Sequence, residues 1–402
     1  MRICHVTSHL PPDQAANALL PLHLGQWAAE AGDSPFYVAH PPRSLSGTPA
    51  AALRQVERDL PGPVTWVEPR TKRMRLPGAS QVASLLDVAR IRRETARAFA
   101  GADVVHVHSN GMLPEASAFL ASRLGTPVVL TLYGTEIWHY APRRFGVDLF
   151  TRAYRTAAHV TFYSGFLRDR AVEVGLQRDA LSVVYPPVAA YFARRDEAAR
   201  LAARAELGLR ESNILLNVKR LHPLAGQRRL IDAMPEVLRA HPDTRVVVCG
   251  TGPLRDDLLA RAAELGVAAH LTLTGLVDNR TVARYQDAAD LFVLPSELEA
   301  LPTVAVEALA SGTPVVSTDN PGGIELGRLF GDDVRVVPRT DPAAFAGAIV
   351  DFLSHRRRTR PSSDEVLARE FSAHVTASRF AAIYRAVVGR AGERHAPRSG
   401  GV

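Results

Sequence analysis

Two glutamates, Glu299 and Glu307, are separated by seven residues in a stretch that is otherwise mostly apolar. The pattern predicts a strand that ends near Pro295, a loop that holds Glu299, and a helix over about 303–310 that holds Glu307. A carboxylate among apolar neighbours needs hydrogen-bond donors, and ribose hydroxyls would supply them to Glu307. From the pattern alone, the alternative is an ordinary strand–helix unit with two surface glutamates.

The start of this helix is a second candidate binding feature. Pro302 suits the first helical turn, because its φ is fixed and it has no N–H that would need a partner. The N–H groups of Thr303 and Val304 would face the crevice at the carboxyl end of the strand, where open α/β sheets bind ligands. Since a helix N-terminus in that place attracts phosphate, the segment predicts a phosphate site.

Short apolar runs alternate with longer amphipathic ones along the 402 residues, which predicts parallel sheets covered by helices. The runs that we expect to form strands are 3–6, 104–107, 128–132, 160–162, 214–218, 246–249, 271–273, 291–294 and 314–317. The alternation pauses at Tyr185-Pro186-Pro187, which suits a linker. We therefore expect domains at 1–187 and 188–365, a helix over 366–390 and a disordered tail over 391–402.

Composition narrows the functional classes. The hydrophobic fraction of 47% and the charged fraction of 22% are those of a globular protein. The net charge of +7 comes from arginine, because Lys72 and Lys219 are the only lysines. Such a surface could attract an anionic substrate or a membrane face, although a GC-rich coding sequence also produces an arginine excess. Without a nucleic-acid-binding signature, we expect no nucleic-acid partner.

Cofactor and compartment signals are sparse. Cys4 and Cys249 lie in apolar runs, and two free thiols are expected rather than a disulfide. No Cys/His spacing suits a metal, and no Asp-x-Asp pair would let a metal bridge phosphates, so no metal or other cofactor is expected. No signal-peptide pattern and no apolar run of about 20 residues are present, which predicts a cytoplasmic protein.

The two glutamates resemble the glutamate–seven residues–glutamate motif of the retaining glycosyltransferases of family 4. That resemblance implies the GT-B fold, with two Rossmann-like doubly wound domains that face a central cleft and a C-terminal helix that crosses back to the first domain. It also implies transfer of a sugar from a nucleotide diphosphate donor. In the family, the glutamate at the position of Glu299 contacts the donor sugar, and the one at the position of Glu307 holds the ribose.

Other motifs follow in the family's order. The segment 217–221 resembles its strand-end Gly-Arg-Leu, which implies that Arg220 contacts the diphosphate. The segments 250–253 and 273–277 resemble two glycine turns, and 321–325 resembles a later loop. The residues that the resemblance places at the donor are Arg220, Glu299, Glu307, Leu301, Thr303, Val304, Gly252 and Gly275.

This chain departs from the family at the diphosphate. The lysine that usually follows the arginine by five residues is replaced by Ala225. Lys219 is our candidate for the missing positive charge, and Arg228 and Arg229 are weaker alternatives. A plain exposed charge at a strand end is the other interpretation of Lys219.

The first half departs as well. The segment 11–17 has no glycine pair, so we expect Asp13, Gln14 and Asn17 to act on the acceptor side through their side chains. The segment 130–136 has Tyr133 where the family often has histidine.

Tyr133 is our catalytic candidate on that segment, and Glu136 is an acceptor-side candidate. Because tyrosine is a poor base at pH 7, Tyr133 suggests an unusual donor sugar or an acceptor that needs little deprotonation, such as a thiol. His108, at the end of a predicted strand, is a further acceptor-side candidate, with a structural histidine as the alternative.

The functional prediction is a retaining transferase that uses a GDP- or UDP-sugar and a small polar acceptor in a specialised-metabolite pathway. Three alternatives stay open: an acceptor that is a lipid or polysaccharide of the cell envelope, with peripheral membrane contact; a non-catalytic nucleotide-sugar-binding protein; and a nucleotide-sugar epimerase of the same fold.

Overall fold

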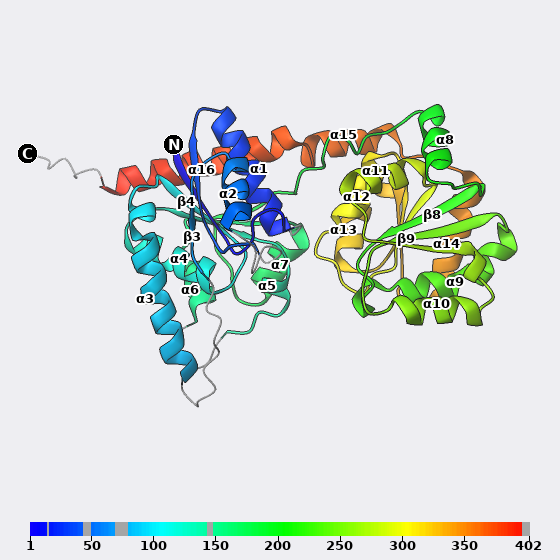
Figure 1. Ribbon diagram of the computed structural model, residues 1–402, viewed down its shortest axis with the longest axis horizontal. Helices are drawn as coiled ribbons and strands as arrows, with labels where there is room; N and C mark the ends of the chain where they lie inside the picture. Colours follow the sequence, from blue (N-terminus) through cyan, green and yellow to red (C-terminus); the bar gives the residue numbers. More distant parts are fainter. Residues whose placement is uncertain (14–15, 43–49, 69–78, 143–147, 396–402) are drawn as a thin grey trace, which may run out of the picture. The chain divides into compact units, whose positions relative to one another are not determined.

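The computed structural model describes residues 1–13, 16–42, 50–68, 79–142 and 148–395. These residues form two compact units (Figure 1). The first unit comprises Met1–Tyr185 together with the end of the chain from Thr376, and the second comprises Pro186–Val375. In each unit, helices surround a sheet in which every strand pair is parallel.

The first unit contains a seven-stranded sheet in the order β3-β2-β1-β4-β5-β6-β7. Its strands are β1 (Arg2–Thr7), β2 (Ser34–Ala39), β3 (Val64–Trp66), β4 (Val104–His108), β5 (Val128–Leu132), β6 (His159–Phe162) and β7 (Leu181–Val183). Its helices are α1 (Ala16–Glu30), α2 (Ala50–Asp59), α3 (Ala79–Ala100), α4 (Met112–Arg123), α5 (Thr135–Trp138), α6 (Leu149–Thr156), α7 (Gly165–Glu173) and most of α16 (Ala373–His395).

The second unit contains a six-stranded sheet in the order β10-β9-β8-β11-β12-β13. Its strands are β8 (Asn213–Val218), β9 (Thr244–Cys249), β10 (Leu271–Gly275), β11 (Leu291–Leu294), β12 (Val315–Thr318) and β13 (Val334–Val337). Its helices are α8 (Glu197–Glu206), η2 (Pro223–Ala225), α9 (Gln227–Ala240), α10 (Arg255–Glu264), η3 (Ala268–His270), α11 (Asn279–Ala288), α12 (Thr303–Ala310), α13 (Pro321–Phe330), η4 (Gly331–Asp333), α14 (Pro342–His355) and α15 (Pro361–Glu370).

The central strands are buried along their whole length, which explains their continuous apolar runs. Every residue of β4, β5 and β11 is buried, as expected for parallel strands that helices cover. In the second unit, Leu215, Val246 and Val293 pack with Leu230 of α9 and Phe345 of α14 in one core. These cores fix the strands whose ends carry the candidate site.

Both sheets contain a point where the strand order reverses. In the first sheet it lies between β1 and β4, and in the second between β8 and β11. The loops that leave such neighbouring strands turn to opposite sides, which opens a ligand crevice at the carboxyl ends of the strands. The glutamate–seven residues–glutamate segment follows β11 and the Arg220 segment follows β8, so both lie at this point of the second sheet.

The end of the chain differs from the sequence-based expectation. Instead of one helix over 366–390, α15 ends at Glu370 and α16 begins at Ala373. The break lies at Phe371, which is buried and whose carbonyl oxygen accepts a hydrogen bond from the N–H of Val188 at 2.9 Å. Residues 391–395 were expected to be disordered but continue α16 as regular helix, and 396–402 lie outside the described residues.

Two further expectations concern cysteines and membranes. Cys4 and Cys249 are both buried free thiols, as predicted. None of the helices in the described part of the chain is both long and apolar enough to cross a membrane.

Candidate functional site

Lys219 and Glu299 form an ion pair at the point where the second sheet reverses its strand order. Lys219 directly follows β8, and Glu299 lies on the loop after β11. The Lys219 Nζ atom is 2.7 Å from Glu299 Oε1 and 2.8 Å from Oε2. The Glu299 side chain is only 9% exposed, whereas that of Lys219 is 31% exposed. The sequence nominated both residues, but it did not predict that they pair.

Arg220 is an available cation beside this pair. Its side chain is exposed, and its guanidinium has no hydrogen-bond or ion-pair partner among the residues that the structure describes. Its backbone is held in place, because Gln227 Nε2 donates to the Arg220 carbonyl at 3.1 Å. The side chain is therefore free to bind an anion, while the backbone of Arg220 is held in place.

The loop that carries Glu299 is anchored on two sides. The N–H of Glu297 donates to the carbonyl of Leu224 at 2.8 Å, and the N–H of Gly322 donates to the carbonyl of Glu299 at 2.9 Å. Arg229 contacts Glu297 Oε1 and the carbonyl of Pro295, each at 2.6 Å. These contacts fix the loop backbone, and the positive charge of Arg229 is already paired with Glu297.

Gly322 allows the first turn of α13 to pack directly on this loop. A Cβ atom at position 322 would lie 2.6 Å from Cδ of Pro302 and 3.0 Å from Cβ of Glu299. Contacts that short would displace the loop or the helix. The sequence motif 321–325 was noted only as a family likeness, and its role as a support for Glu299 was not predicted.

The N-terminus of α12 lies next to the same loop. Pro302 is the residue before the helix, and Thr303 and Val304 are its first two residues. Within the described ranges, the N–H groups of Thr303 and Val304 have no acceptor, and both side chains are half-buried. Leu301 is 9% exposed. Two free donors and the positive end of a helix dipole are thus available to an anion.

Glu307 lies one turn further along α12, between the buried residues Val306 and Ala308. Burial raises the pKa of Glu307 to about 7, because a carboxylate loses hydration in an apolar environment. In the described part of the chain, no group forms a hydrogen bond with this carboxyl. Its charge also raises the pKa of Tyr191, although burial of that ring is the larger cause. Glu307 is therefore a half-buried carboxyl that lacks donors.

The two predicted donor-side glycines lie at strand ends of the same sheet. Gly252 packs against the β8 loop, because a Cβ there would lie 2.1 Å from the carbonyl oxygen of Leu221. Gly275 ends β10 with a φ of +79°, a conformation that favours glycine. These positions explain the glycines by backbone packing and conformation, and their contact with a donor stays a prediction.

The candidates of the first unit take different roles. Asp13 accepts a hydrogen bond from His9 Nδ1 at 3.1 Å. Gln14 lies outside the described residues, and so does the side chain of Asn17. Glu136 is 5% exposed and accepts from Ser109 Oγ and from the N–H of Gly134, both at 2.7 Å. It therefore ties the loop after β4 to the loop after β5.

Tyr133 and His108 contact each other at the carboxyl ends of β5 and β4. His108 Nδ1 lies 2.9 Å from the Tyr133 hydroxyl, and the His108 side chain is fully buried. Burial, together with the neighbouring Tyr163, raises the pKa of the half-buried Tyr133 well above its ordinary value. His108 thus reaches no solvent of its own, and Tyr133 is the partly exposed end of the pair.

Two family models match successive parts of the chain. The model described as Glycosyltransferase Family 4 matches residues 22–190, and the model described as Glycosyl transferases group 1 matches residues 200–365. The chain belongs to glycosyltransferase family 4. This membership confirms the resemblance that the ordered motifs indicated.

Individual family 4 relatives match with moderate identity. The GDP-mannose-dependent alpha-(1-6)-phosphatidylinositol monomannoside mannosyltransferase of Mycolicibacterium smegmatis is 33% identical over 60% of this chain and 64% of its own length. The D-inositol 3-phosphate glycosyltransferase of Segniliparus rotundus is 35% identical over 47% of this chain and 43% of its own length. The matches thus span less than two thirds of these relatives. The alpha-D-kanosaminyltransferase of Streptomyces kanamyceticus is 29% identical over 78% of this chain and 84% of its own.

Solved structures share the fold at low identity. Anabaena Alr3699/HepE in complex with UDP has a TM-score of 0.72 at 17% identity, covering 96% of this chain and 100% of that chain. A glycosyltransferase from Rickettsia africae has a TM-score of 0.72 at 14% identity, covering 96% and 98%. These structures confirm the predicted GT-B fold of the family.

The structure shows the surroundings of the position where family 4 usually has a lysine at the diphosphate and this chain has alanine. Ala225, at the lysine position, is 3% exposed and ends the short helix η2. Arg229 is paired with Glu297, and Arg228 lies 3.8 Å from Asp232 and is largely exposed. Of the three replacement candidates, Lys219 is the one whose charge lies against Glu299.

Proposed function

We propose that the protein transfers a sugar from a nucleotide diphosphate donor to a small polar acceptor, with retention at the anomeric carbon. The observation that carries the proposal is the group of features where β8 and β11 meet. They are an arginine without a partner among the described residues, a lysine–glutamate pair, and a helix N-terminus whose first N–H groups have no acceptor among those residues. Such a set is complementary to a diphosphate that is linked to a sugar.

The chemistry assigns a separate task to each group. Breaking the sugar–phosphate bond leaves negative charge on the diphosphate, which Arg220 and the N-terminus of α12 would stabilise. The Lys219 ammonium has three N–H donors, so it can keep Glu299 and also donate to a phosphate oxygen. Glu299 would accept from sugar hydroxyls, and Glu307 from the ribose. We propose that these groups, rather than a metal, balance the diphosphate charge.

The acceptor is proposed from chemistry shared by the relatives. The names of two of them include phosphatidylinositol monomannoside, a lipid with a hydroxylated headgroup, and D-inositol 3-phosphate, a small hydroxylated molecule. We propose a small polyhydroxylated acceptor, and a GDP- or UDP-linked hexose as the donor. A thiol and a cell-envelope lipid are the alternative acceptors, and a lipid acceptor would bring the protein into peripheral contact with a membrane.

The test begins with the nucleotide. Thermal melting is measured with UDP, GDP, ADP and dTDP, and the nucleotide that stabilises the protein selects the sugar donors. Those donors are then incubated with panels of alcohols, thiols and lipid headgroups, with and without EDTA, and the product anomer is read from its proton coupling constant.

We expect transfer with retention that survives EDTA and that is lost in Arg220→Ala. Stabilisation by a nucleotide without any transfer or donor hydrolysis would contradict an enzymatic role and favour a binding protein. A changed sugar in the absence of acceptor would point to an epimerase.

A further inference from the structure

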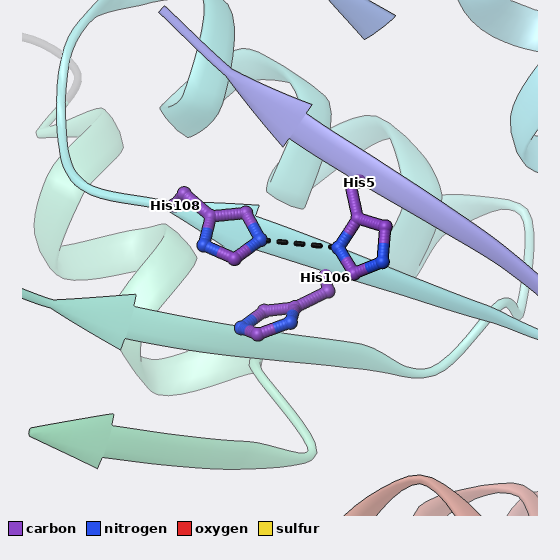
Figure 2. Close-up of side chains that lie close together, drawn as sticks. All are labelled: His5, His106 and His108. Carbon is purple, nitrogen blue, oxygen red and sulfur yellow. Dashed lines mark hydrogen bonds between the residues drawn. The ribbon is translucent and has the colours of Figure 1, made fainter. Parts of the chain in front are cut away.

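Three histidines that are distant in sequence form a buried cluster in the first unit (Figure 2). His5 lies on β1, and His106 and His108 lie on the neighbouring strand β4. Because residues two apart on a strand share a face, His106 and His108 project to the same side. All three side chains have no exposed surface. Figure 2 shows the three rings grouped together.

The three imidazoles are neutral. Burial lowers the pKa of His5 to about 3. It also lowers the pKa values of His106 and His108 well below their ordinary range, with a smaller contribution from the neighbouring imidazoles. A neutral imidazole has one N–H donor and one acceptor nitrogen. Each ring must therefore be placed in one of two tautomers, and its neighbours select which one.

Five of the six ring nitrogens already have partners. His5 Nδ1 lies 3.2 Å from His108 Nε2, and His108 Nδ1 lies 2.9 Å from the Tyr133 hydroxyl. His106 Nδ1 lies 2.6 Å from the Tyr384 hydroxyl, and His106 Nε2 lies 2.6 Å from the Thr131 hydroxyl. Because a metal ion would have to displace these bonds, the cluster suits a hydrogen-bond chain better than a cation site.

The sixth ring nitrogen, Nε2 of His5, decides in which direction these hydrogen bonds run. His5 Nε2 is buried and has no hydrogen-bond partner in the described part of the protein. A buried N–H group without an acceptor is rarer than an acceptor without a donor. We therefore assign the proton of His5 to Nδ1, which then donates to His108 Nε2. The proton of His108 must then lie on Nδ1, which donates to the Tyr133 oxygen.

This direction leaves the Tyr133 proton free to be donated. With its oxygen accepting from His108 Nδ1, the hydroxyl keeps its own proton for another acceptor. The rings of Tyr133 and Tyr163 have centroids 4.4 Å apart. A substrate oxygen that comes within reach of Tyr133 can accept that proton.

We propose that His5 and His108 are positioning residues that hold Tyr133 as a hydrogen-bond donor to a sugar oxygen of the substrate. The catalytic role of Tyr133 rests on the proposed function, whereas the direction of the hydrogen bonds does not. A donor in that position binds a hydroxyl or ring oxygen without removing a proton from the acceptor. This direction of the hydrogen bonds therefore predicts that Tyr133 orients and polarises the substrate rather than acting as a base.

The first test reads the tautomers directly and needs no activity. Long-range ¹⁵N–¹H spectra of the full protein, with ¹⁵N-labelled histidine, are assigned with His5→Gln and His108→Asn variants. We expect His5 and His108 in the Nδ1–H form, unchanged between pH 5.5 and 8. An Nε2–H form of either ring would overturn the proposal, as would stoichiometric zinc or another transition metal in the purified protein.

The second test separates positioning from structural support. An asparagine amide can take the place of Nδ1, and a glutamine amide reaches the place of Nε2. His108→Asn should therefore keep most of the turnover, while His108→Gln should lower kcat about as far as Tyr133→Phe does. His108→Gln should add no further loss in a Tyr133→Phe background. Equal losses in both His108 variants, or losses that multiply in the double variant, would overturn the proposal.

Two controls keep these outcomes distinct. Melting temperatures identify variants that fail to fold, and His5→Gln replaces His108→Gln if that variant does not fold. If the wild-type protein transfers no sugar from any donor, the proposed function fails, but the tautomer spectra still decide whether the hydrogen-bond chain exists.

Discussion

Replacing Glu307 by glutamine should make the second unit more stable at high pH while weakening its binding of a nucleotide. The carboxyl lies between buried residues of α12 and has no hydrogen-bond donor in the described part of the chain, and burial raises its pKa from the ordinary 4.5 to about 7. A shift of about 2.5 pH units corresponds to roughly 3 kcal/mol. Ionised Glu307 therefore lowers the stability of the folded protein, and a glutamine of nearly equal shape removes the charge.

The sign of the pH dependence follows from proton binding. Between about pH 4.5 and 7, the folded protein keeps the Glu307 proton and the unfolded chain loses it, so the wild-type free energy of unfolding falls as pH rises. Glu307→Gln lacks this titration. The difference between the free energies of unfolding of the variant and the wild type should thus increase by up to about 3 kcal/mol from pH 4.5 to 8.

The assay must distinguish the two units, because a chain with two compact units need not unfold in a single step. All three tryptophans, Trp27, Trp66 and Trp138, lie in the first unit. Urea unfolding by tryptophan fluorescence therefore reports the first unit, and circular dichroism reports both. Glu236→Gln, at an exposed position on α9, is the matched control and should show no such increase. A difference that is constant with pH for Glu307→Gln would refute the reasoning.

Two further predictions concern the loop beside Glu307. Lys219→Ala should slow turnover and also lower stability by about 1–3 kcal/mol, because it leaves the nearly buried Glu299 carboxylate without its partner. Lys219→Arg should restore the stability, and unchanged donor kinetics in Lys219→Ala would remove Lys219 from the site. Gly322→Ala should lower kcat, because the new Cβ would meet Pro302 and Glu299. Gly347→Ala in α14, where a Cβ meets nothing within 4 Å, should keep activity and raise the melting temperature, and equal activity loss in both glycine variants would contradict the account.

The sequence predicted the parts of the fold whose signals are local. Buried parallel strands such as Val128–Leu132 are continuous apolar runs, and the segment after Pro295 predicted the helix that begins at Thr303. Four strands were not predicted: Ser34–Ala39, Val64–Trp66, Leu181–Val183 and Val334–Val337. Val64–Trp66 and Leu181–Val183 are only three residues long and half-buried. Such short strands carry little periodicity, and they form because a neighbouring strand offers its edge.

The contacts of the candidate site depend on residues far apart in sequence. Glu299 and Glu307 are recognisable from their spacing, but the Lys219–Glu299 pair joins loops 80 residues apart. The contact of His5 with His108 spans 103 residues, and no motif around His5 signals it. Only the pairing of neighbouring strands brings such residues together, so sequence spacing could nominate the candidates but could not predict their partners.

The most direct test of the central claim is a crystal structure of the protein with the nucleoside diphosphate that best stabilises it. We predict that the diphosphate lies within hydrogen-bond distance of Arg220 and of the N–H groups of Thr303 and Val304, with the ribose hydroxyls on Glu307 and the open end of the diphosphate towards Glu299. Nucleotide bound elsewhere, with Arg220 and Glu307 both free of it, would contradict the account.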